Sequence, residues 1–236
     1  MFWIALAVLA GTGVVVTSLA LIGAPFLPAR LRVRIGQGIL HHFFRRYFRV
    51  LSASGLFQFE LDALTSLAGE RPMVLVANHP ALLDAMLVAA RVPNMVGIMK
   101  ADVRLSPIYA GAALLAGYAR ADRPIEMIHA MVKALSFGQH VLVFPESTRT
   151  VRRPVNPFKG NFALIAKQAR VPVQTLIIET DSTYLSKGWS MFRKPPMPVR
   201  FNVRLGQRFD AGADVKQFVH AIEAYFVAEL ADRTIR

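Results

Sequence analysis

The chain has 236 residues, of which 54% are hydrophobic and only 18% are charged, so it is more apolar than a typical soluble domain. This composition excludes a mainly disordered chain, and the presence of only one uncharged stretch of membrane-spanning length excludes a protein with many spans. Lys and Arg outnumber Asp and Glu by 28 to 15, a net charge of +13 that favours anionic partners, and the absence of cysteine excludes disulfides and a cysteine nucleophile.

Residues 1–29 contain no charged side chain and are almost wholly apolar. About 20 such residues suffice to cross a bilayer, so we expect a membrane anchor, either one spanning helix or a re-entrant pair. The first positive charges, Arg30, Arg32 and Arg34, follow the apolar run instead of preceding it as in a signal peptide. The positive-inside rule then places the rest of the chain in the cytoplasm.

The next segment combines apolar and aromatic residues with arginine at helical spacing. The apolar set is Leu40, Phe43, Phe44, Tyr47 and Leu51, and the polar set is His41, Arg45, Arg46 and Arg49. This pattern is typical of a helix lying among lipid headgroups, and the alternative is a core helix with a solvated basic face. We therefore assign residues 1–54 to a membrane anchor with an interfacial helix, and residues 55–236 to a separate domain.

Short apolar runs alternate with helical patterns through this second part. We expect strands at Leu56–Leu61, Met73–Ala77, Val96–Met99, Val141–Phe144, Val173–Ile178 and Val199–Leu205. We expect helices at Ala81–Arg91, Pro107–Leu115, Ile125–Phe137, Asn161–Ala169 and Val215–Ala231, and a surface loop at Lys187–Pro198. Several strands are unbroken apolar runs, as in a sheet buried on both faces. The sequence thus predicts an α/β domain with a mostly parallel sheet flanked by helices.

Polar clusters follow two of these strands directly, where ligands bind in α/β folds. If the two strands are neighbours, His79, Asp84, Glu146 and Arg149 converge on one rim. An aspartate just over one helical turn after a histidine can orient the imidazole as a general base. The sequence has no G-x-S-x-G nucleophile motif, so the base would deprotonate a hydroxyl of the substrate itself. Cations that could hold a phosphate are Arg149, Arg123, Lys159 and Lys100.

Other interpretations of the same residues remain open. Asn78 and His79 before a proline could be a strand-to-helix turn, and Glu146 could be a first-turn residue after a helix cap. His79, Asp84 and Glu146 could instead bind a divalent metal ion. Neither an H-E-x-x-H motif nor a phosphate-binding G-x-x-x-x-G-K motif accompanies them.

Together the motifs resemble those of the glycerolipid acyltransferase family, in particular the bacterial lysophosphatidic acid acyltransferases. Asn78, His79 and Asp84 match the family motif N-H-x-x-x-x-D, and residues 144–149 resemble its Phe-Pro-Glu-Gly-Thr-Arg block. Gly117 with Asp122 and Arg123, and residues 171–175, resemble two further blocks in family order. The sequence departs from the family at Ser147, which replaces a glycine, at Thr175, which replaces a proline, and at the more polar segment 118–121.

The resemblance implies roles for individual residues. His79 would be the general base and Asp84 would hold it. The acceptor site would comprise Asn78, Lys100, Arg123, Glu146, Ser147, Thr148, Arg149 and Lys159. No metal and no cofactor would be needed, because the co-substrate is an acyl thioester of acyl carrier protein or coenzyme A.

The implied function is a membrane-bound O-acyltransferase of the bacterial inner membrane that acylates a lysophospholipid, with its catalytic domain facing the cytoplasm. Lysophosphatidic acid is the acceptor that the resemblance favours. Two alternatives are the same chemistry on a lyso-aminolipid or a specialised polyene or resorcinol lipid, and a non-catalytic lipid-binding protein anchored in the membrane. The expected partners are the thioester donor, the lipid acceptor and an anionic membrane surface, with no nucleic acid.

Overall fold

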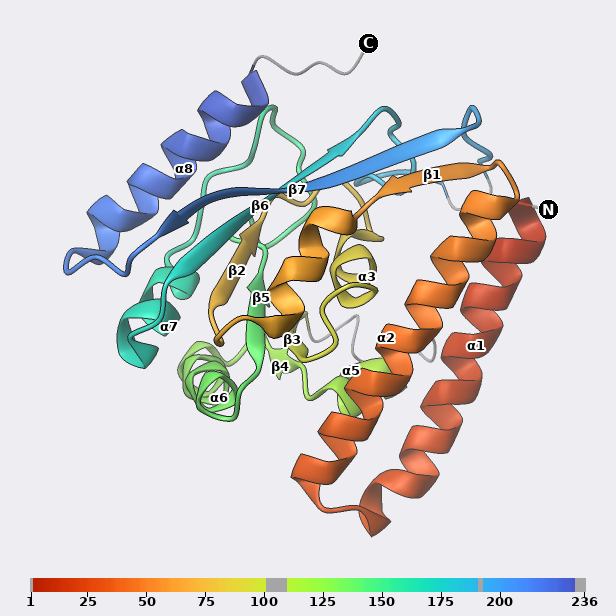
Figure 1. Cartoon of the computed structure of the whole chain (residues 1–236), viewed down its shortest axis with the longest axis horizontal. Coiled ribbons are helices and arrows are strands. Elements are labelled where there is room, and N and C mark those ends of the chain that lie inside the picture. The colour runs from red at the N-terminus through yellow and green to blue at the C-terminus, as the bar shows by residue number, and fades with distance from the viewer. Residues whose placement is uncertain (1, 101–109, 191–192, 232–236) are drawn as a thin grey trace.

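A computed structural model describes residues 2–100, 110–190 and 193–231 (Figure 1). Its helices are α1 (Phe2–Gly23), α2 (Ala29–Ala53), α3 (Asp84–Ala89), α5 (Ala110–Ala116), α6 (Pro124–Ser136), α7 (Asn161–Ala169) and α8 (Val215–Ala231), with 3-10 helices η1 (Ala24–Phe26) and η2 (Asp62–Gly69). Its strands are β1 (Phe57–Glu60), β2 (Val74–Ala77), β3 (Met95–Met99), β4 (Ala119–Arg120), β5 (His140–Val143), β6 (Val173–Thr180) and β7 (Val199–Phe209).

The described strands form one sheet in the order β1-β7-β6-β2-β5-β3-β4. All neighbouring pairs are parallel except β6 and β7, which are antiparallel. The predicted α/β class with a mostly parallel sheet is therefore confirmed. Because β2 and β5 are direct neighbours, with Val76 opposite Val143, the polar clusters that follow them lie at the same edge of the sheet.

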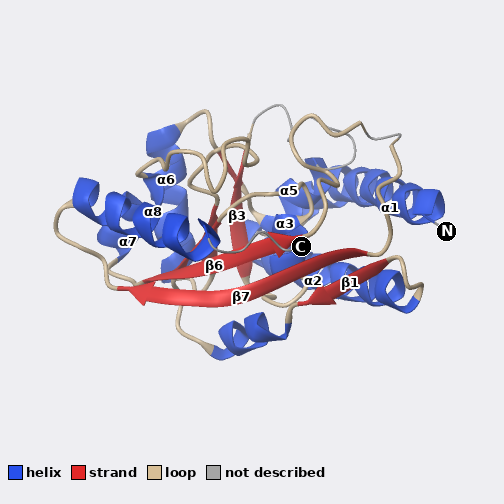
Figure 2. Ribbon diagram, turned by 90° about the horizontal axis from the view of Figure 1, so that it is seen from above, coloured by secondary structure: helices blue, strands red, loops and turns tan. Residues whose placement is uncertain are grey.

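Both faces of the sheet are covered, which explains the unbroken apolar strands. In β2, Leu75 and Ala77 belong to one apolar cluster with residues of α2, η2 and α3, whereas Val74 and Val76 belong to a second cluster with residues of α6, α7 and α8. Figures 1 and 2 show α6, α7 and α8 on one side of the molecule and α1 and α2 on the other.

The N-terminal helices pack against α5. The backbone N–H of Gly111 in α5 donates a hydrogen bond to the Thr17 hydroxyl of α1 at 2.9 Å, and a side chain at Gly111 would collide with the Thr17 backbone. Gly36 of α2 lies equally close to the backbone of Leu115. Among the described helices, α1 is the one that is long and apolar enough to cross a membrane, and most of its residues are at least partly exposed.

Several boundaries differ from the predicted ones. The helix expected at Ala81–Arg91 begins only at Asp84, because the chain turns after Pro80 before it becomes helical. The first residues of the helix expected at Pro107–Leu115 lie outside the described residues, and the rest is α5. Within Lys187–Pro198, expected to be a loop, the described residues form neither helix nor strand. Neither η2 nor the two-residue strand β4 was expected from the sequence pattern.

Candidate active site

His79 and Asp84 meet at the carboxyl end of β2. The strand ends at Ala77, the chain turns, and Asp84 is the first residue of α3. His79 Nδ1 lies 2.7 Å from Asp84 Oδ2, and the same oxygen accepts a hydrogen bond of 2.8 Å from the Ala81 backbone N–H. The Phe144 ring stacks on the imidazole with centroids 4.1 Å apart. The imidazole is therefore fixed on one face by a ring and at one nitrogen by a carboxylate.

This geometry assigns the tautomer of the histidine. A carboxylate oxygen only accepts hydrogen bonds, so Nδ1 of His79 carries the proton and Nε2 is left with its lone pair. Nε2 has no hydrogen-bond partner among the described residues, and the side chain is 18% exposed. Complete burial raises the pKa of the Asp84 carboxyl, and the hydrogen bond from His79 offsets part of that shift. Such a pair can accept a proton at Nε2 and stabilise the resulting imidazolium.

Buried Glu146 bonds to the backbone of the loop that carries His79. It is buried, and its Oε1 accepts hydrogen bonds from the His79 backbone N–H at 2.9 Å and the Thr150 hydroxyl at 2.7 Å. Its Oε2 accepts a bond of 2.8 Å from the Asn156 backbone N–H. The Thr150 N–H in turn donates to the His79 carbonyl at 2.7 Å. These contacts hold His79 in place, a role that the sequence pattern alone could not separate from binding the acceptor.

Asn78 connects two strands. Its amide NH₂ donates to the Ile178 carbonyl and its amide oxygen accepts from the Ile178 N–H, both at 2.8 Å. The side chain is buried, and its amide makes the two bonds that a backbone peptide group would make. It therefore continues the pairing of β2 with β6 beyond the end of β2. The expectation that Asn78 also binds the acceptor stays a prediction.

The cations predicted to bind phosphate occupy different positions. Nη1 of Arg149 donates to the carbonyls of Leu185 and Ser186 at 2.7 and 2.8 Å, which leaves other N–H groups of its guanidinium for a ligand. Arg123 precedes α6 on the surface and pairs with Glu126 at 3.1 Å. Lys100 and Lys159 are exposed. Among the described residues, Arg149 is the one of these four side chains that bonds to a neighbouring loop of the site.

The departures from the family blocks have distinct surroundings. Ser147 adopts a left-handed backbone conformation with φ of 57°, which explains why glycine suits this position. The half-buried Thr148 follows it. The buried Thr175 donates its hydroxyl to the Gln207 carbonyl at 2.8 Å, beside a register shift between β6 and β7. Thr175 thus stabilises the pairing of β6 with β7, whereas Ser147 lies in the loop of the candidate site, directly after Glu146.

The alternative of a metal site finds no support in the described residues. Within residues 2–100, 110–190 and 193–231, no three His, Cys, Asp or Glu side chains gather as metal ligands would. Glu146 bonds instead to the donors that surround it, and Asp84 to His79 and Ala81.

Sequence and structure comparisons identify the family of the chain. The sequence profile of the family named Acyltransferase matches residues 58–179, more than half of the chain and all of the residues around His79, Asp84 and Glu146. The chain is 27% identical over 168 residues to a 1-acyl-sn-glycerol-3-phosphate acyltransferase of Cocos nucifera, covering 67% of this chain and 54% of that protein. It thus spans about half the length of that relative.

Two further comparisons extend this result. A lyso-ornithine lipid O-acyltransferase of Pseudomonas aeruginosa is 32% identical over 115 residues, which cover 47% of this chain and 44% of that protein. The crystal structure of the 1-acyl-sn-glycerophosphate acyltransferase PlsC of Thermotoga maritima superposes with a TM-score of 0.70, covering 100% of this chain and 93% of that one at 21% identity, and so shares the fold. The resemblance read from the motifs is thereby confirmed, and the chain belongs to the acyltransferase family.

Proposed function

We propose that this protein is a membrane-bound O-acyltransferase that transfers an acyl chain from a thioester of acyl carrier protein or coenzyme A to the free hydroxyl of a lysophospholipid. The observation that carries the proposal is the hydrogen bond of 2.7 Å between His79 and the buried Asp84 at the carboxyl end of β2, with Nε2 left free among the described residues. We take lysophosphatidic acid as the acceptor, because its phosphate suits the cations around the site.

The reaction follows from the assigned tautomer. Nε2 of His79 removes the proton of the acceptor hydroxyl as that oxygen attacks the thioester carbonyl carbon. A new C–O bond forms, the C–S bond breaks, and the proton passes from the imidazolium to the departing sulfur. Asp84 stabilises the imidazolium between these two transfers. The products are an ester and a free thiol, so the reaction needs no cofactor beyond the co-substrate.

Arg149 is the cation best placed to hold the acceptor's phosphate. Its backbone follows Glu146 and Ser147, and Nη1 already fixes the guanidinium against the loop at Leu185. Arg123, Lys100, Lys159 and Thr148 remain proposed helpers. We expect Arg149→Ala to raise the KM for lysophosphatidic acid about tenfold or more, in keeping with the loss of a charge-assisted hydrogen bond, with a smaller effect on kcat. An unchanged KM would indicate an acceptor without a phosphate.

The N-terminal helices would hold the enzyme on the membrane. The surface of α1 exposes Ile4, Val15, Leu19 and Ile22, and α1 is long enough to enter a bilayer. The positive charge of the chain would favour the anionic cytoplasmic leaflet of a bacterial inner membrane. The Tyr47 hydroxyl donates to the Ala5 carbonyl at 3.1 Å, so α1 and α2 would dock as a pair.

A second acceptor class has a specific observation in its favour. The relative from Pseudomonas aeruginosa acts on a lyso-ornithine lipid and is more identical in sequence than the coconut protein, although over a shorter segment. Ser147, where the family block has glycine, lies among the residues expected to contact the acceptor. A lyso-aminolipid is therefore our alternative acceptor.

The test is acyl transfer by purified full-length protein, with His79→Ala as the control. Two labelled donors, the acyl thioester of acyl carrier protein and acyl coenzyme A, are each tested with lysophosphatidic acid and with lyso-ornithine lipid. We expect transfer to lysophosphatidic acid that falls by about a hundredfold or more in His79→Ala. Transfer only to lyso-ornithine lipid would select the alternative acceptor. Folded protein that transfers to neither, with either donor, would contradict the proposed chemistry.

A further inference from the structure

A cavity lies between α2 and η2, away from His79. Its volume is about 410 Å³, and neither His79 nor any of its hydrogen-bonding partners lines it. Helix α3 begins at Asp84 in the active site, and the residues after its other end, Ala90 and Arg91, form part of the cavity wall. The cavity is therefore separated from the site by the length of α3.

Two helices supply the long walls. From α2 come His41, Arg45, Arg49 and Ser52, whose spacing places them on one stripe of an α-helix. From η2 come Asp62, Thr65 and Ala68, which recur every third residue and so share one face of a 3-10 helix. The regular spacing on both sides means that the polar side chains face each other across the same space.

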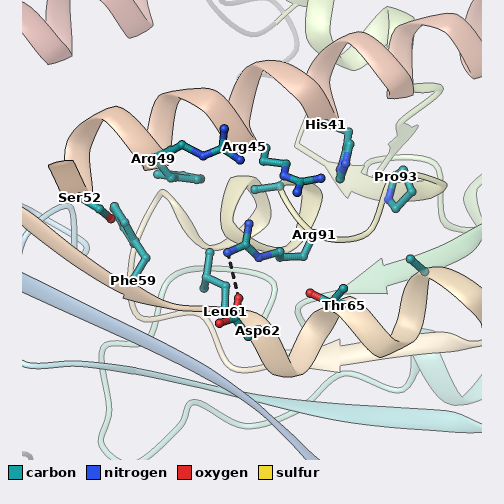
Figure 3. Close-up of a pocket in the computed structure, with 13 residues that line it drawn as sticks. His41, Arg45, Arg49, Ser52, Phe59, Leu61, Asp62, Thr65, Arg91 and Pro93 are labelled. Atoms are coloured by element: carbon teal, nitrogen blue, oxygen red, sulfur yellow. Dashed lines mark hydrogen bonds and ion pairs between the residues drawn. The ribbon is translucent and has the colours of Figure 1, made fainter.

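The cavity is strongly basic. Arg45, Arg49 and Arg91 all line it, and Figure 3 shows the guanidinium groups of Arg45 and Arg91 in the space between the two helices. Arg45 and Arg49 form no ion pair with any carboxylate among the described residues. Arg91 pairs with Asp62 at 3.2 Å, but the Asp62 side chain is 97% exposed, so this pair is weak. Three cations thus face one carboxylate.

The rest of the lining suits a lipid. Phe48, Phe59 and Leu61 give the cavity an apolar part beside its guanidinium groups. The exposed surface of α2 adjoining the basic stripe carries Leu31, Ile35 and other large apolar side chains. If this surface faces the bilayer, the basic stripe lies at the depth of the headgroups, where phosphate groups are concentrated. Arginine forks match the geometry of phosphate oxygens.

We propose that this cavity binds the phosphate of an anionic membrane phospholipid through Arg45, Arg49 and Arg91, as a lipid site additional to the acceptor site. The apolar lining would contact the first methylene groups of the lipid's acyl chains, and Asp62 would limit the affinity by neutralising part of the charge. The proposal concerns binding alone and does not depend on the proposed reaction. It is tested in full-length protein carrying His79→Ala, so that a failure of acyl transfer and a failure of this site remain distinguishable.

The experiment is calorimetric titration of detergent-purified protein with soluble dihexanoyl phosphatidylglycerol. The cavity variant is Arg45→Gln/Arg49→Gln. The matched control is Arg34→Gln/Arg46→Gln, which removes the same charge from exposed positions of α2 that do not line the cavity. If the lipid is attracted only by diffuse positive charge, both variants should lose phosphatidylglycerol affinity to the same extent. A discrete site predicts a loss at least about tenfold greater in the cavity variant, because charge-assisted hydrogen bonds are lost as well.

A variant that is expected to bind the lipid more tightly is also needed, because a loss of affinity could come from misfolding whereas a gain could not. Asp62→Asn removes the carboxylate that pairs with Arg91, and we expect it to tighten phosphatidylglycerol binding by up to about fivefold, the upper end for an exposed ion pair. Equal losses in the cavity and control variants, or no gain in Asp62→Asn, would overturn the proposal. So would inorganic phosphate that binds the cavity as tightly as the lipid, or cavity substitutions that weaken acyl carrier protein binding and leave lipid affinity unchanged.

Discussion

Replacing Asp84 by asparagine separates the charge of this residue from its shape. Both hydrogen bonds that Asp84 accepts, from His79 Nδ1 and the Ala81 N–H, end on the single atom Oδ2. An asparagine can place its amide oxygen there and keep both bonds, because the reverse orientation would set its NH₂ against the Ala81 N–H. We therefore expect Asp84→Asn to preserve the tautomer of His79 and to remove only the negative charge beside it.

The size of the effect follows from that lost charge. A charge-assisted hydrogen bond exceeds a neutral one by about 1–2 kcal/mol, and full Coulomb attraction between two charges about 4 Å apart near a protein surface is about 4 kcal/mol. An intermediate loss of about 3 kcal/mol in the stabilisation of the imidazolium corresponds to a decrease in kcat of about a hundredfold. His79→Ala, which removes the base itself, should lose at least as much.

Asp84→Asn should lower kcat without lowering the stability of the fold. Asp84 Oδ1 is buried without a hydrogen-bond partner among the described residues, and burial raises the pKa of the carboxyl. A raised pKa means that the folded state binds the proton more tightly than the unfolded state, so wild-type stability falls as pH rises through the folded pKa. Asp84→Asn lacks this decrease. We expect it to have an equal or higher Tm than the wild type at neutral pH.

The assay combines acyl transfer with thermal unfolding, and Asp210→Asn is the control. Asp210 is exposed and forms none of the described hydrogen bonds, so the same chemical change there should alter neither quantity. Wild-type turnover in Asp84→Asn would refute the role of the charge. A decrease in turnover together with a lower Tm would refute the argument that the substitution spares the structure.

Three further predictions concern neighbouring parts of the molecule. Glu146→Gln must direct its NH₂ at one of two buried backbone N–H groups, so we expect a loss of about 2 kcal/mol in unfolding free energy and lower turnover; unchanged denaturant midpoints would contradict it. Ser147→Gly relieves the left-handed backbone and should stabilise by about 0.5–1 kcal/mol while improving turnover on lysophosphatidic acid, measured by unfolding and by acyl transfer. Asp214 caps α8 by accepting bonds from the backbone N–H groups of Gln217 and Lys216 at 3.0 and 2.8 Å, and these bonds lower the pKa of its carboxyl. Its contribution to stability is present above its unfolded pKa and lost as pH falls through the folded one, so Asp214→Ala should lower the Tm at neutral pH and leave it unchanged in strong acid.

Local patterns were sufficient for most of the fold. The helix at Asn161–Ala169 has the predicted bounds because apolar spacing and a following turn define both ends. The direction of β7 could not be predicted, since its alternation of apolar and polar residues does not show that it pairs in parallel with β1 and antiparallel with β6. Nor could η2, because Leu61, Leu64 and Leu67 recur every third residue and match neither the α-helical nor the strand period.

The pairing of residues in the candidate site could be predicted in part. The spacing of His79 and Asp84 indicated their pairing, and the adjacency of β2 and β5 then brought Glu146 beneath them. The function of Glu146 as a support depends on Asn156, which reaches it only through the fold of the intervening loop. The basic cavity could not be predicted for a related reason. The stripe of basic residues on α2 could be recognised in the sequence, but Arg91 comes from a distant segment of the chain.

The two bonds between Asn78 and the backbone of Ile178 bear on how activity is inferred from motifs. In this chain the asparagine of the N-H-x-x-x-x-D motif bonds two strands together, whereas the histidine and aspartate form the proposed catalytic pair. A homologue that had lost its histidine would still need the asparagine to fold, and would continue to score as a partial match. Surveys of genomes for active members should therefore not take the asparagine alone as a sign of activity and should require the histidine and aspartate together.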